Sequence, residues 1–481
     1  MFSQVQQPID NSIKPLSLVC LMLVVFIATL DQTIVATTLT PIGHALGDAD
    51  AAPWIATAYL LTSAVTTLIL GKLGDIVGRK PVLLASTAIF VVASALCASA
   101  PDMIWLIVFR AIQGIGGGGL SPLVMAVMGD LVPARERARY HAMLGVIPAV
   151  AIILGPVLGG LIVDHLVWQW IFLLNVPIGL VAIAAIATQI KLPRGRQRRR
   201  LDVAGSVLAV IYTTAFLLVA VEGGTAYSWD SWQIAGLAML GVVALLAYLQ
   251  VERKAPEPIT PLELFKNSIF VVSAGLFFTS TAALFVCMLF VPMMLQMVFG
   301  LSASAAGGSI VPLLFGLIVA TMVTGNRVAH TGRYRSFPVV GALLSGTGFY
   351  ALSRIDINTP LWYLLLLLTV IGFGIGCFIQ VVILAGQNAV DQQHLGSATG
   401  ALNFFKTMGG AFGAAIFGAL LANQMPAGHD LSLMLDAFAS TYRYAAILMA
   451  LTLVLACMLR EKPLSAEMLE VAEGKVDVPE Y

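Results

Sequence analysis

Charged side chains are scarce in this sequence. Asp, Glu, Lys and Arg together make up 11% of its 481 residues, whereas a soluble domain would carry about a quarter. The 26 basic and 25 acidic residues nearly cancel, so there is no concentrated basic face for phosphate recognition and no nucleic-acid partner is expected. Hydrophobic residues reach 59%. This composition leaves no room for a large soluble domain and predicts an all-α membrane protein with many spans.

Residue patterns that would hold a metal, a cofactor or a disulfide framework are also missing. The five cysteines are far apart and fall within or beside apolar runs, as packing residues do. No His, Cys or carboxylate cluster has metal-ligand spacing, and there is no GxxxxGK[ST] phosphate loop. Gly114, Gly116 and Gly119 satisfy GxGxxG, but inside an apolar run rather than between a strand and a helix. We therefore expect no cofactor, no metal, no enzymatic activity and no built-in use of ATP.

The apolar runs predict fourteen helices long enough to cross about 30 Å of hydrocarbon. The first run contains Asp31 and no small-residue cleavage site follows it, so we expect it to remain as a span. The expected ranges are 16–38, 54–72, 81–100, 103–124, 141–163, 168–190, 204–222, 232–250, 269–297, 305–325, 337–353, 361–386, 398–422 and 444–459.

Loop charges predict the orientation of the chain. Every even-numbered predicted helix except the twelfth is followed by a basic loop, and the most basic of these lies at 191–200. The opposite loops carry mainly aspartates, with Arg354 and Arg443 as basic exceptions. By the positive-inside rule, both termini then face the cytoplasm.

A faint internal repeat predicts two related halves. GKLGDIVGRK from Gly71 aligns with GNRVAHTGRY from Gly325, so that two glycines and an arginine match. Paired six-helix halves with a substrate site between them are a recurring transporter plan. We expect an N-terminal six-helix bundle at 1–190, a linker with two additional transmembrane helices at 191–268, a C-terminal six-helix bundle at 269–460 and a cytoplasmic tail at 461–481.

The first copy of this repeat, residues 71–80, reads as a tight charged turn in which Gly71 and Gly78 let the backbone bend. Asp75 can sit against a helix N-terminus, and Arg79 can pair with Asp130 at the end of the fourth predicted helix. A plain positive-inside anchor is the alternative. That alternative explains Arg79 but neither Asp75 nor the glycine spacing.

Small residues and a proline interrupt the fifth predicted helix at Gly155, Pro156, Gly159 and Gly160. Small residues let a neighbouring helix approach closely, and proline removes a backbone donor and bends its helix. Ordinary helix packing can explain the glycines alone. The complete string ILGPVLGG indicates a function only through its resemblance to a family motif.

Two ionisable residues are expected at similar depth within the bilayer. Asp31 lies about 22 Å along the first helix from Leu16, and Arg110 lies about 10 Å from the other end of the fourth. An ion pair between them, direct or through Gln113, is geometrically possible. An intramembrane charge is costly and is by default functional. Asp31 either exchanges a proton as the pair opens and closes or forms a static pair that orients the helices.

Candidates for a substrate cavity come mainly from the second half. Methionine and aromatic side chains of the ninth predicted helix adapt to varied apolar ligands, although the same stripe could face lipid. Lys406 lies deep in the thirteenth predicted helix, where it either faces the cavity or reaches back toward the cytoplasm. The cavity candidates are Gln113, Met288, Phe290, Met293, Met294, Gln296, Met297, Gln380, Gln387, Asn403 and Lys406.

The motifs, in this order, resemble those of the fourteen-helix drug:proton antiporters of the major facilitator superfamily. The resembling segments are LDQTIVATTLTPI from Leu30, WIATAYLL from Trp54, GKLGDIVGRK from Gly71, FRAIQGIGGGG from Phe109, ILGPVLGG from Ile153, WQWIFLLNVPIG from Trp168, and GQNAV with NFFKTMGGAFGAAIFG in the second half. Unlike many relatives, the chain has no acidic residue in its tenth predicted helix, which argues against divalent cationic drugs.

The resemblance implies a major facilitator fold of two six-helix bundles plus two inserted helices, in a bacterial cytoplasmic (inner) membrane. It implies that 71–80 latches the two halves on the cytoplasmic side, that ILGPVLGG is the antiporter motif, and that lipophilic drugs are exported in exchange for protons. The expected partners are a small-molecule substrate, protons and membrane lipids. We expect a monomer, with accessory export partners left open.

Two other functions compete with drug export. Dedicated export of one native metabolite or lipid would use the same machinery. A nontransporting membrane sensor would not need Asp31, Arg110 and the antiporter string together, and it would normally carry a soluble output domain.

Overall fold

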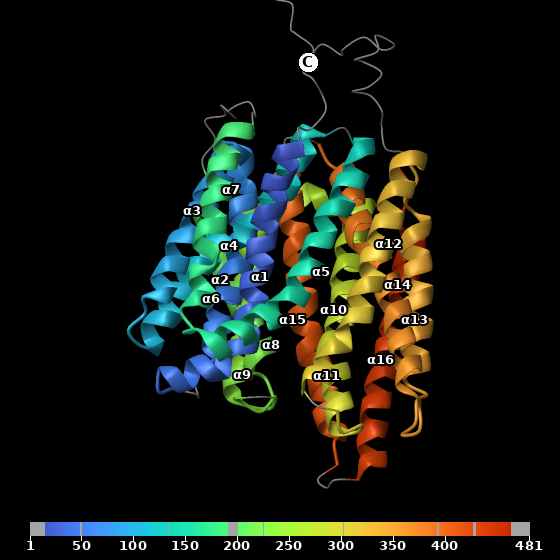
Figure 1. Cartoon of the computed structure of the whole chain (residues 1–481). Coiled ribbons are helices and arrows are strands. Elements are labelled where there is room, and N and C mark those ends of the chain that lie inside the picture. Colours follow the sequence, from blue (N-terminus) through green and yellow to red (C-terminus); the bar gives the residue numbers. More distant parts are fainter. Residues whose placement is uncertain are drawn as a thin grey trace, which may run out of the picture.

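The computed structural model is a bundle of helices running in alternating directions (Figure 1). It describes residues 15–48, 51–132, 134–190, 201–224, 226–301, 303–391, 394–426 and 430–462. The elements are α1 (Pro15–Ala45), α2 (Pro53–Val77), α3 (Arg79–Ala98), α4 (Met103–Leu131), α5 (Ala134–His165), α6 (Trp170–Leu173), α7 (Asn175–Gln189), α8 (Val203–Glu222), α9 (Trp232–Glu252), the 3-10 helix η1 (Leu262–Lys266), α10 (Ser268–Met297), α11 (Ala303–Gly308), α12 (Ile310–Thr331), α13 (Ser336–Leu352), α14 (Leu361–Asn388), α15 (Leu395–Gln424) and α16 (Leu431–Met458).

Each predicted span overlaps a helix of the structure. Within the described residues, 13 helices are long and apolar enough to cross a membrane, and α13 is a shorter apolar helix. Capping side chains set several helix starts: Asp102 accepts a hydrogen bond from the Trp105 N–H, and Ser231 accepts one from the Ile234 N–H. Such caps satisfy backbone donors that the first helical turn leaves without partners.

Several predicted boundaries are wrong: the helices predicted at 16–38 and 103–124 continue to Ala45 and Leu131, and the helix predicted at 141–163 begins at Ala134. Residues 71–80 are not an extended turn, because α2 continues to Val77 and α3 begins at Arg79, so that only Gly78, with φ 107°, separates the helices. The last span does not begin at 444, because α16 begins at Leu431. Asp436 and Arg443, which interrupt the apolar run, lie on the exposed side of that helix. Arg443 therefore belongs to a helix and not to a loop.

The buried apolar side chains separate into groups that follow the chain. In the described part, two clusters draw on residues 18–190, and a larger one draws mainly on residues 209–459. Of the helix pair α8 and α9, α8 packs against α2 of the first half and α15 of the second, and α9 packs against α8. Tyr212 of α8 makes edge-to-face contact with Phe404 of α15. The pair therefore lies against the seam between the two halves.

The seam itself is closest where α2 crosses α15. A Cβ added to Gly71 would lie 2.8 Å from the carbonyl oxygen of Gly396, and one added to Gly400 would lie 2.9 Å from that of Thr67. Only glycine allows two backbones to approach this closely. Gly71, which the sequence presented as a turn residue, therefore serves helix packing between the halves.

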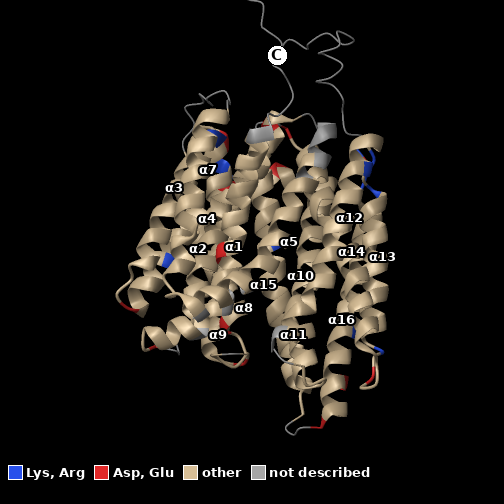
Figure 2. Cartoon of the chain, in the orientation of Figure 1, with Lys and Arg blue, Asp and Glu red and all other residues tan. Residues whose placement is uncertain are grey.

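The two ends of the bundle differ in composition. Pro15 and Lys462 lie at one end, which we call the basic end because it carries Lys72, Arg79, Lys80, Arg253, Lys254, Lys266, Arg327, Arg333, Arg335, Arg460 and Lys462. Figure 2 shows Lys and Arg in several places at this end and little charge along the helices between the two ends. The opposite end, the tryptophan end, carries Trp54, Trp105, Trp168, Trp170, Trp229, Trp232 and Trp362. Tryptophan favours membrane interfaces, so these rings mark a bilayer boundary.

Close helix approach gives a test of the packing in the second half. A Cβ added to Gly372 of α14 would lie 1.9 Å from the carbonyl oxygen of Leu313 in α12. We expect Gly372→Ala to lower the free energy of unfolding by about 1–3 kcal/mol, because a rigid backbone must shift to admit the methyl group. The measurement is the midpoint of thermal unfolding of the purified protein.

Gly236→Ala is the matched control, since a Cβ at that helical position meets nothing within 4 Å. An unchanged midpoint for Gly372→Ala would contradict the described approach of α12 and α14.

Candidate functional site

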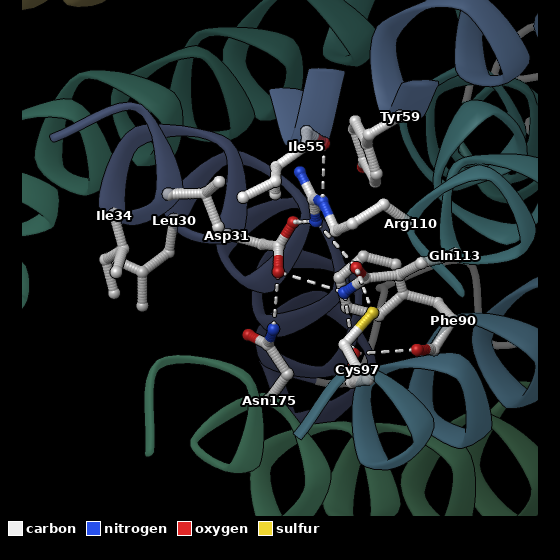
Figure 3. A network of polar contacts seen from close by, with 12 residues as sticks. Leu30, Asp31, Ile34, Ile55, Tyr59, Phe90, Cys97, Arg110, Gln113 and Asn175 are labelled. Carbon is white, nitrogen blue, oxygen red and sulfur yellow. Dashed lines mark hydrogen bonds and ion pairs between the residues drawn. The ribbon is translucent and has the colours of Figure 1, made fainter. Parts of the chain in front are cut away.

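The side chain of Asp31 is the centre of a buried polar network in the first half (Figure 3). It lies in α1 and is 0% exposed. Its Oδ2 accepts a hydrogen bond from Arg110 Nη1 at 2.6 Å, and its Oδ1 accepts from Gln113 Nε2 at 2.9 Å and from Asn175 Nδ2 at 2.8 Å. The sequence allowed a direct pair or one through Gln113, and the structure shows both contacts. Three helices, α4, α7 and α1 itself, thus meet at one carboxylate.

Arg110 is held from several sides. Its Nε donates to the backbone oxygen of Ile55 in α2 at 3.0 Å. Its guanidinium lies 4.4 Å from the ring centroid of Tyr59 and 5.7 Å from that of Phe172, within the range of cation–π attraction. The residue is 1% exposed. These contacts compensate for removing the charge from water and fix the direction in which it faces Asp31.

The amide of Gln113 is fully engaged inside this network. Its Nε2 donates to Asp31 and to Ser94 Oγ at 2.7 Å, and its Oε1 accepts from Arg110 Nη1 at 2.6 Å and from Cys97 Sγ at 3.7 Å. The prediction placed Gln113 among the substrate candidates. In this conformation it has no spare donor, so its observed position is that of a residue orienting Asp31 and Arg110.

Asn175 is a member of the network that sequence reasoning did not single out. It lies in the segment WQWIFLLNVPIG, which resembles a motif of the family, but the sequence predicted no role for it. The structure places it at the first residue of α7, 1% exposed, against Asp31. An asparagine among apolar residues, next to a helix break, was the available signal. The sequence does not show where the sixth predicted span breaks between α6 and α7, so the depth of Asn175 in the membrane could not be compared with that of Asp31.

The three side chains that contact Asp31 all donate hydrogen bonds to it. The guanidinium of Arg110 and the amide nitrogens of Gln113 and Asn175 all donate to the carboxylate oxygens. A carboxylate accepts such bonds, whereas a protonated carboxyl group would have to donate one of its own. Protonation of Asp31 would therefore remove the charge that holds Arg110 and require the network to rearrange.

A second charged cluster connects the two halves at the basic end. Both carboxylate oxygens of Asp75 in α2 accept backbone hydrogen bonds from the start of α15, from the Gly396 N–H at 2.9 Å and the Ser397 N–H at 2.8 Å. The Ser397 hydroxyl also donates to Asp75, at 3.0 Å. A helix N-terminus carries partial positive charge and unpaired N–H groups, so it favours this carboxylate.

Arg79 ties the same cluster to α4. Its Nη2 donates to Asp75 at 3.0 Å, and its Nη1 donates to the side chain of Asp130 and to the backbone oxygen of Ala126. The sequence allowed both the Asp75 contact with a helix N-terminus and the Arg79–Asp130 pair, and the structure contains both. Gly71 lies at the close contact between α2 and α15, and Gly78 separates α2 from α3. The latch role assigned to these residues stays a prediction.

Lys72 and Glu257 form a further contact that the sequence did not predict. Lys72 lies within α2 rather than in a loop, and it is 2% exposed. Its Nζ lies 3.1 Å from Glu257 Oε2. Glu257 belongs to the segment after α9. That segment is also held by Glu252, which accepts hydrogen bonds from the Ile259 N–H at 3.1 Å and the Thr260 N–H at 3.3 Å. The inserted helices are thereby joined to α2.

The residues of the antiporter string have unequal surroundings. Gly155 is buried against α1, where an added Cβ would lie 2.2 Å from Thr33 Oγ1, whereas Gly160 is exposed and an added Cβ would meet nothing within 4 Å. Gly159 is buried. The side chain of Pro156 lies outside the described residues. The string therefore packs α5 against α1 through Gly155, and its part in antiport stays a prediction.

The substrate candidates of the second half do not lie together. Met294 is 0% exposed, whereas Gln296 is exposed near the end of α10 and donates to the backbone oxygen of Pro292. Gln387 is buried at the seam, donating to Thr399 Oγ1 at 3.0 Å and to the Met125 backbone oxygen at 3.5 Å. The other methionines of the predicted stripe are only partly buried or exposed: Met288, Met293 and Met297.

Two further candidates lie on α15. Asn403 is 7% exposed and donates to the Thr399 backbone oxygen at 2.9 Å. Lys406 is partly exposed, and its Nζ lies 5.7 Å from the ring centroid of Phe277 in α10. Phe277 is itself fully buried in a membrane-spanning helix. The ammonium therefore remains at the depth of its own helix and does not reach a loop at the basic end.

Comparison with known proteins agrees with this architecture. The model of the Major Facilitator Superfamily matches residues 21–414. The chain belongs to this superfamily. It is 36% identical over 414 residues to the multidrug transporter protein MdtP of Bacillus subtilis (strain 168), a match covering 85% of this chain and 76% of that protein. It is 32% identical over 403 residues to multidrug resistance protein 3 of the same organism, covering 84% and 78% respectively.

The fold comparison gives the same result. The structure of the proton:xylose symporter XylE bound to 6-bromo-6-deoxy-D-glucose matches with a TM-score of 0.67 and 15% identity, covering 95% of this chain and 98% of that one. Identity at this level shows the fold alone. Together with the family match, it establishes an all-α major facilitator fold, and the chain is a multi-pass membrane transporter and not an enzyme.

The buried pair gives a second test. Arg110→Met would leave the Asp31 carboxylate in the protein interior without its charge partner, and we expect a loss of about 3–5 kcal/mol of stability. The double variant Asp31→Asn with Arg110→Met removes both charges, so it should lose less than Arg110→Met alone. Thermal unfolding of the purified variants, analysed as a double-mutant cycle, measures this coupling. Strictly additive effects would show that the pair does not interact energetically.

Proposed function

We propose that this protein exports lipophilic small molecules across a bacterial cytoplasmic membrane in exchange for protons, by alternating access. The observation that carries the proposal is the Asp31 carboxylate, fully buried in a membrane helix and surrounded by N–H donors, with Arg110 at 2.6 Å. Such a carboxylate can be ionised or protonated, and the surrounding helices make different contacts with the two forms. The names of its relatives, a multidrug transporter protein and a multidrug resistance protein, support drugs as cargo.

Proton entry provides the driving force for this cycle. One elementary charge crossing a potential of 100 mV contributes about 2.3 kcal/mol, which corresponds to appreciable accumulation of a substrate. Binding of a proton to Asp31 cancels the charge that holds Arg110 across α1 and α4. Release of the proton restores the pair. Cargo moves outward when the two halves change their contacts between these states.

The seam between the halves supports a conformation closed at the basic end. Contacts across it include Asp75 with the start of α15, Gly71 with Gly396, and Gln387 with Met125. Deeper in the bundle, a Cβ added to Gly145 of α5 would meet the amide of Gln380 in α14. With basic residues on the cytoplasmic side, as the positive-inside rule requires, this is the conformation that faces outward. Both termini are then cytoplasmic.

Proton coupling is tested with the full chain in proteoliposomes under an imposed pH gradient. We expect Asp31→Asn to abolish gradient-driven accumulation across a panel of cationic, neutral and anionic lipophilic compounds, because its amide cannot carry a proton through the cycle. Exchange of labelled for unlabelled compound without a gradient should persist. Asp102→Asn, which alters only the exposed cap of α4, should accumulate as the native protein does.

Accumulation by Asp31→Asn at the native level would exclude Asp31 as the proton carrier. Equal transport by the native protein after collapse of both voltage and pH gradient would exclude secondary active transport.

The latch is tested by distance measurement. Asp75→Asn places an amide N–H2 group against the N–H donors of Gly396 and Ser397, so we expect it to weaken the contact of α2 with α15. Spin labels at Val77 and Asp391, exposed positions beside this contact, report the separation of the halves. In a background without native cysteines, Asp75→Asn should increase the population at long distances, and Asp102→Asn should not. Identical distributions for all three proteins would contradict the latch.

A further inference from the structure

The segment that follows α9, residues 253–267, contacts both halves of the molecule, and we call it the strap. On one side, Glu257 of the strap pairs with Lys72 of α2, with 3.1 Å between Oε2 and Nζ. On the other side, Asn267 Nδ2 donates to the backbone oxygen of Ala389, at the end of α14, at 2.8 Å. The strap therefore runs from the first half to the second at the basic end.

Apolar contacts anchor the strap to the second half. The ring centroid of Phe265 lies 5.6 Å from that of Phe270 in α10 and 6.3 Å from that of Phe405 in α15, both edge-to-face. Ile259 and Leu264 are buried in the larger apolar cluster, to which most of the second half belongs. Burial of apolar area and paired aromatic rings hold packed segments together. This anchoring does not depend on the ion pair with α2.

The backbone around Glu257 is stiff. Glu257 stands between Pro256 and Pro258 in the string APEPIT. Proline fixes its own φ and restricts the residue before it. The buried carboxylate of Glu252, at the end of α9, accepts hydrogen bonds from two backbone N–H groups later in the strap, at 3.1 and 3.3 Å. The backbone of Glu257 therefore loses little conformational entropy when the ion pair forms.

The two members of the pair differ in burial. Lys72 is 2% exposed, whereas the side chain of Glu257 is 22% exposed. In the part of the chain that the structure describes, the Lys72 ammonium has one hydrogen-bonding partner, which is Glu257. Lys72 directly follows Gly71, which meets Gly396 of α15 at the closest part of the seam. The ammonium thus depends on the strap for its compensation, at the place where the halves are in contact.

We propose that the Lys72–Glu257 pair is a second tie between the halves, made when the basic end is closed and broken when it opens. This inference rests on the alternating access of the proposed function and names a device that biases it. Separation of α2 from α15 carries Lys72 away from a strap anchored to the second half, and water then reaches its ammonium. A buried charge that loses its partner is costly, whereas an exposed ion pair contributes little. The pair therefore stabilises the closed, outward-facing conformation selectively.

Spin labels at Val77 and Asp391 of the full chain, in a background without native cysteines, measure the separation of the halves. We expect Glu257→Gln to raise the ratio of long to short distances by about tenfold, because the buried ammonium without its charge partner disfavours the closed conformation. Glu263→Gln is the matched control, since Glu263 also lies on the strap but is exposed. This control should keep the native distribution.

A double variant separates the ion pair from a general loosening of the strap. Lys72→Met keeps the length of the side chain but removes the buried charge. Combined with Glu257→Gln, it leaves no ammonium without a partner, so we expect this protein to return toward the native short distances. Equal opening of Glu257→Gln and the double variant, or a native distribution for Glu257→Gln, would overturn the proposal.

The movement of the strap is followed with the ion pair intact. Spin labels at Glu263 are paired with Val77 in one protein and with Asp391 in another, and distances are measured at acid and at alkaline pH. Where the halves separate, the distance from Glu263 to Val77 should lengthen and the distance from Glu263 to Asp391 should stay constant. This measurement decides the question if unfolding midpoints show that Glu257→Gln is not folded.

The same distances separate this inference from the proposed function. If the halves separate while Glu263 keeps its distance to Val77, the strap follows α2, and the second tie is refuted although alternating access stands. If the halves of the native protein keep one separation at every pH and with every lipophilic compound of the panel, alternating access is refuted, and the tie with it. Opening by Glu257→Gln without gradient-driven accumulation by the native protein would support the tie and refute proton-coupled export.

Discussion

The buried ion pair between Asp31 and Arg110 is the constraint on which the first half of the molecule depends. Two charges inside a bilayer are tolerated only when they are paired and their remaining hydrogen-bonding groups are satisfied. That condition requires Gln113, Asn175, the Ile55 carbonyl and the faces of two aromatic rings to be in place at once. The network therefore fixes how α1, α2, α4, α6 and α7 meet.

Glycine has a related role between the halves, because it determines where backbones can meet. Gly71 and Gly396 let α2 and α15 approach closely enough for Asp75 to receive the N–H groups at the start of α15. A larger residue at either glycine would separate the helices and remove these hydrogen bonds. The steric and the electrostatic parts of this contact are therefore inseparable. Both act at the basic end, and of the two helices α2 is also held by Arg110, through the Ile55 carbonyl.

The inserted helices α8 and α9 are part of this arrangement rather than an appendage. Tyr212 contacts α15, and the segment after α9 reaches Lys72 of α2 through Glu257. A pair of helices that touches both halves must adjust when those halves move relative to each other. The second half adds Lys406 and Gln380, two polar groups at membrane depth that the proton network leaves unused.

Apolar run length determined the helices, and the sequence motifs indicated the family, because both depend on local composition and order. Asp31, Arg110, Asp75 and Arg79 could be selected from sequence, since a charge in an apolar run is conspicuous. Tertiary structure decided the rest. Asn175, Lys72 and Glu257 are ordinary polar or charged residues in sequence, and their importance comes only from the neighbours that distant helices bring. The helical course of residues 71–77 and the early start of α16 were missed for the same physical reason: backbone hydrogen bonding continues through glycines and exposed charges, whereas hydropathy records only where side chains prefer to lie.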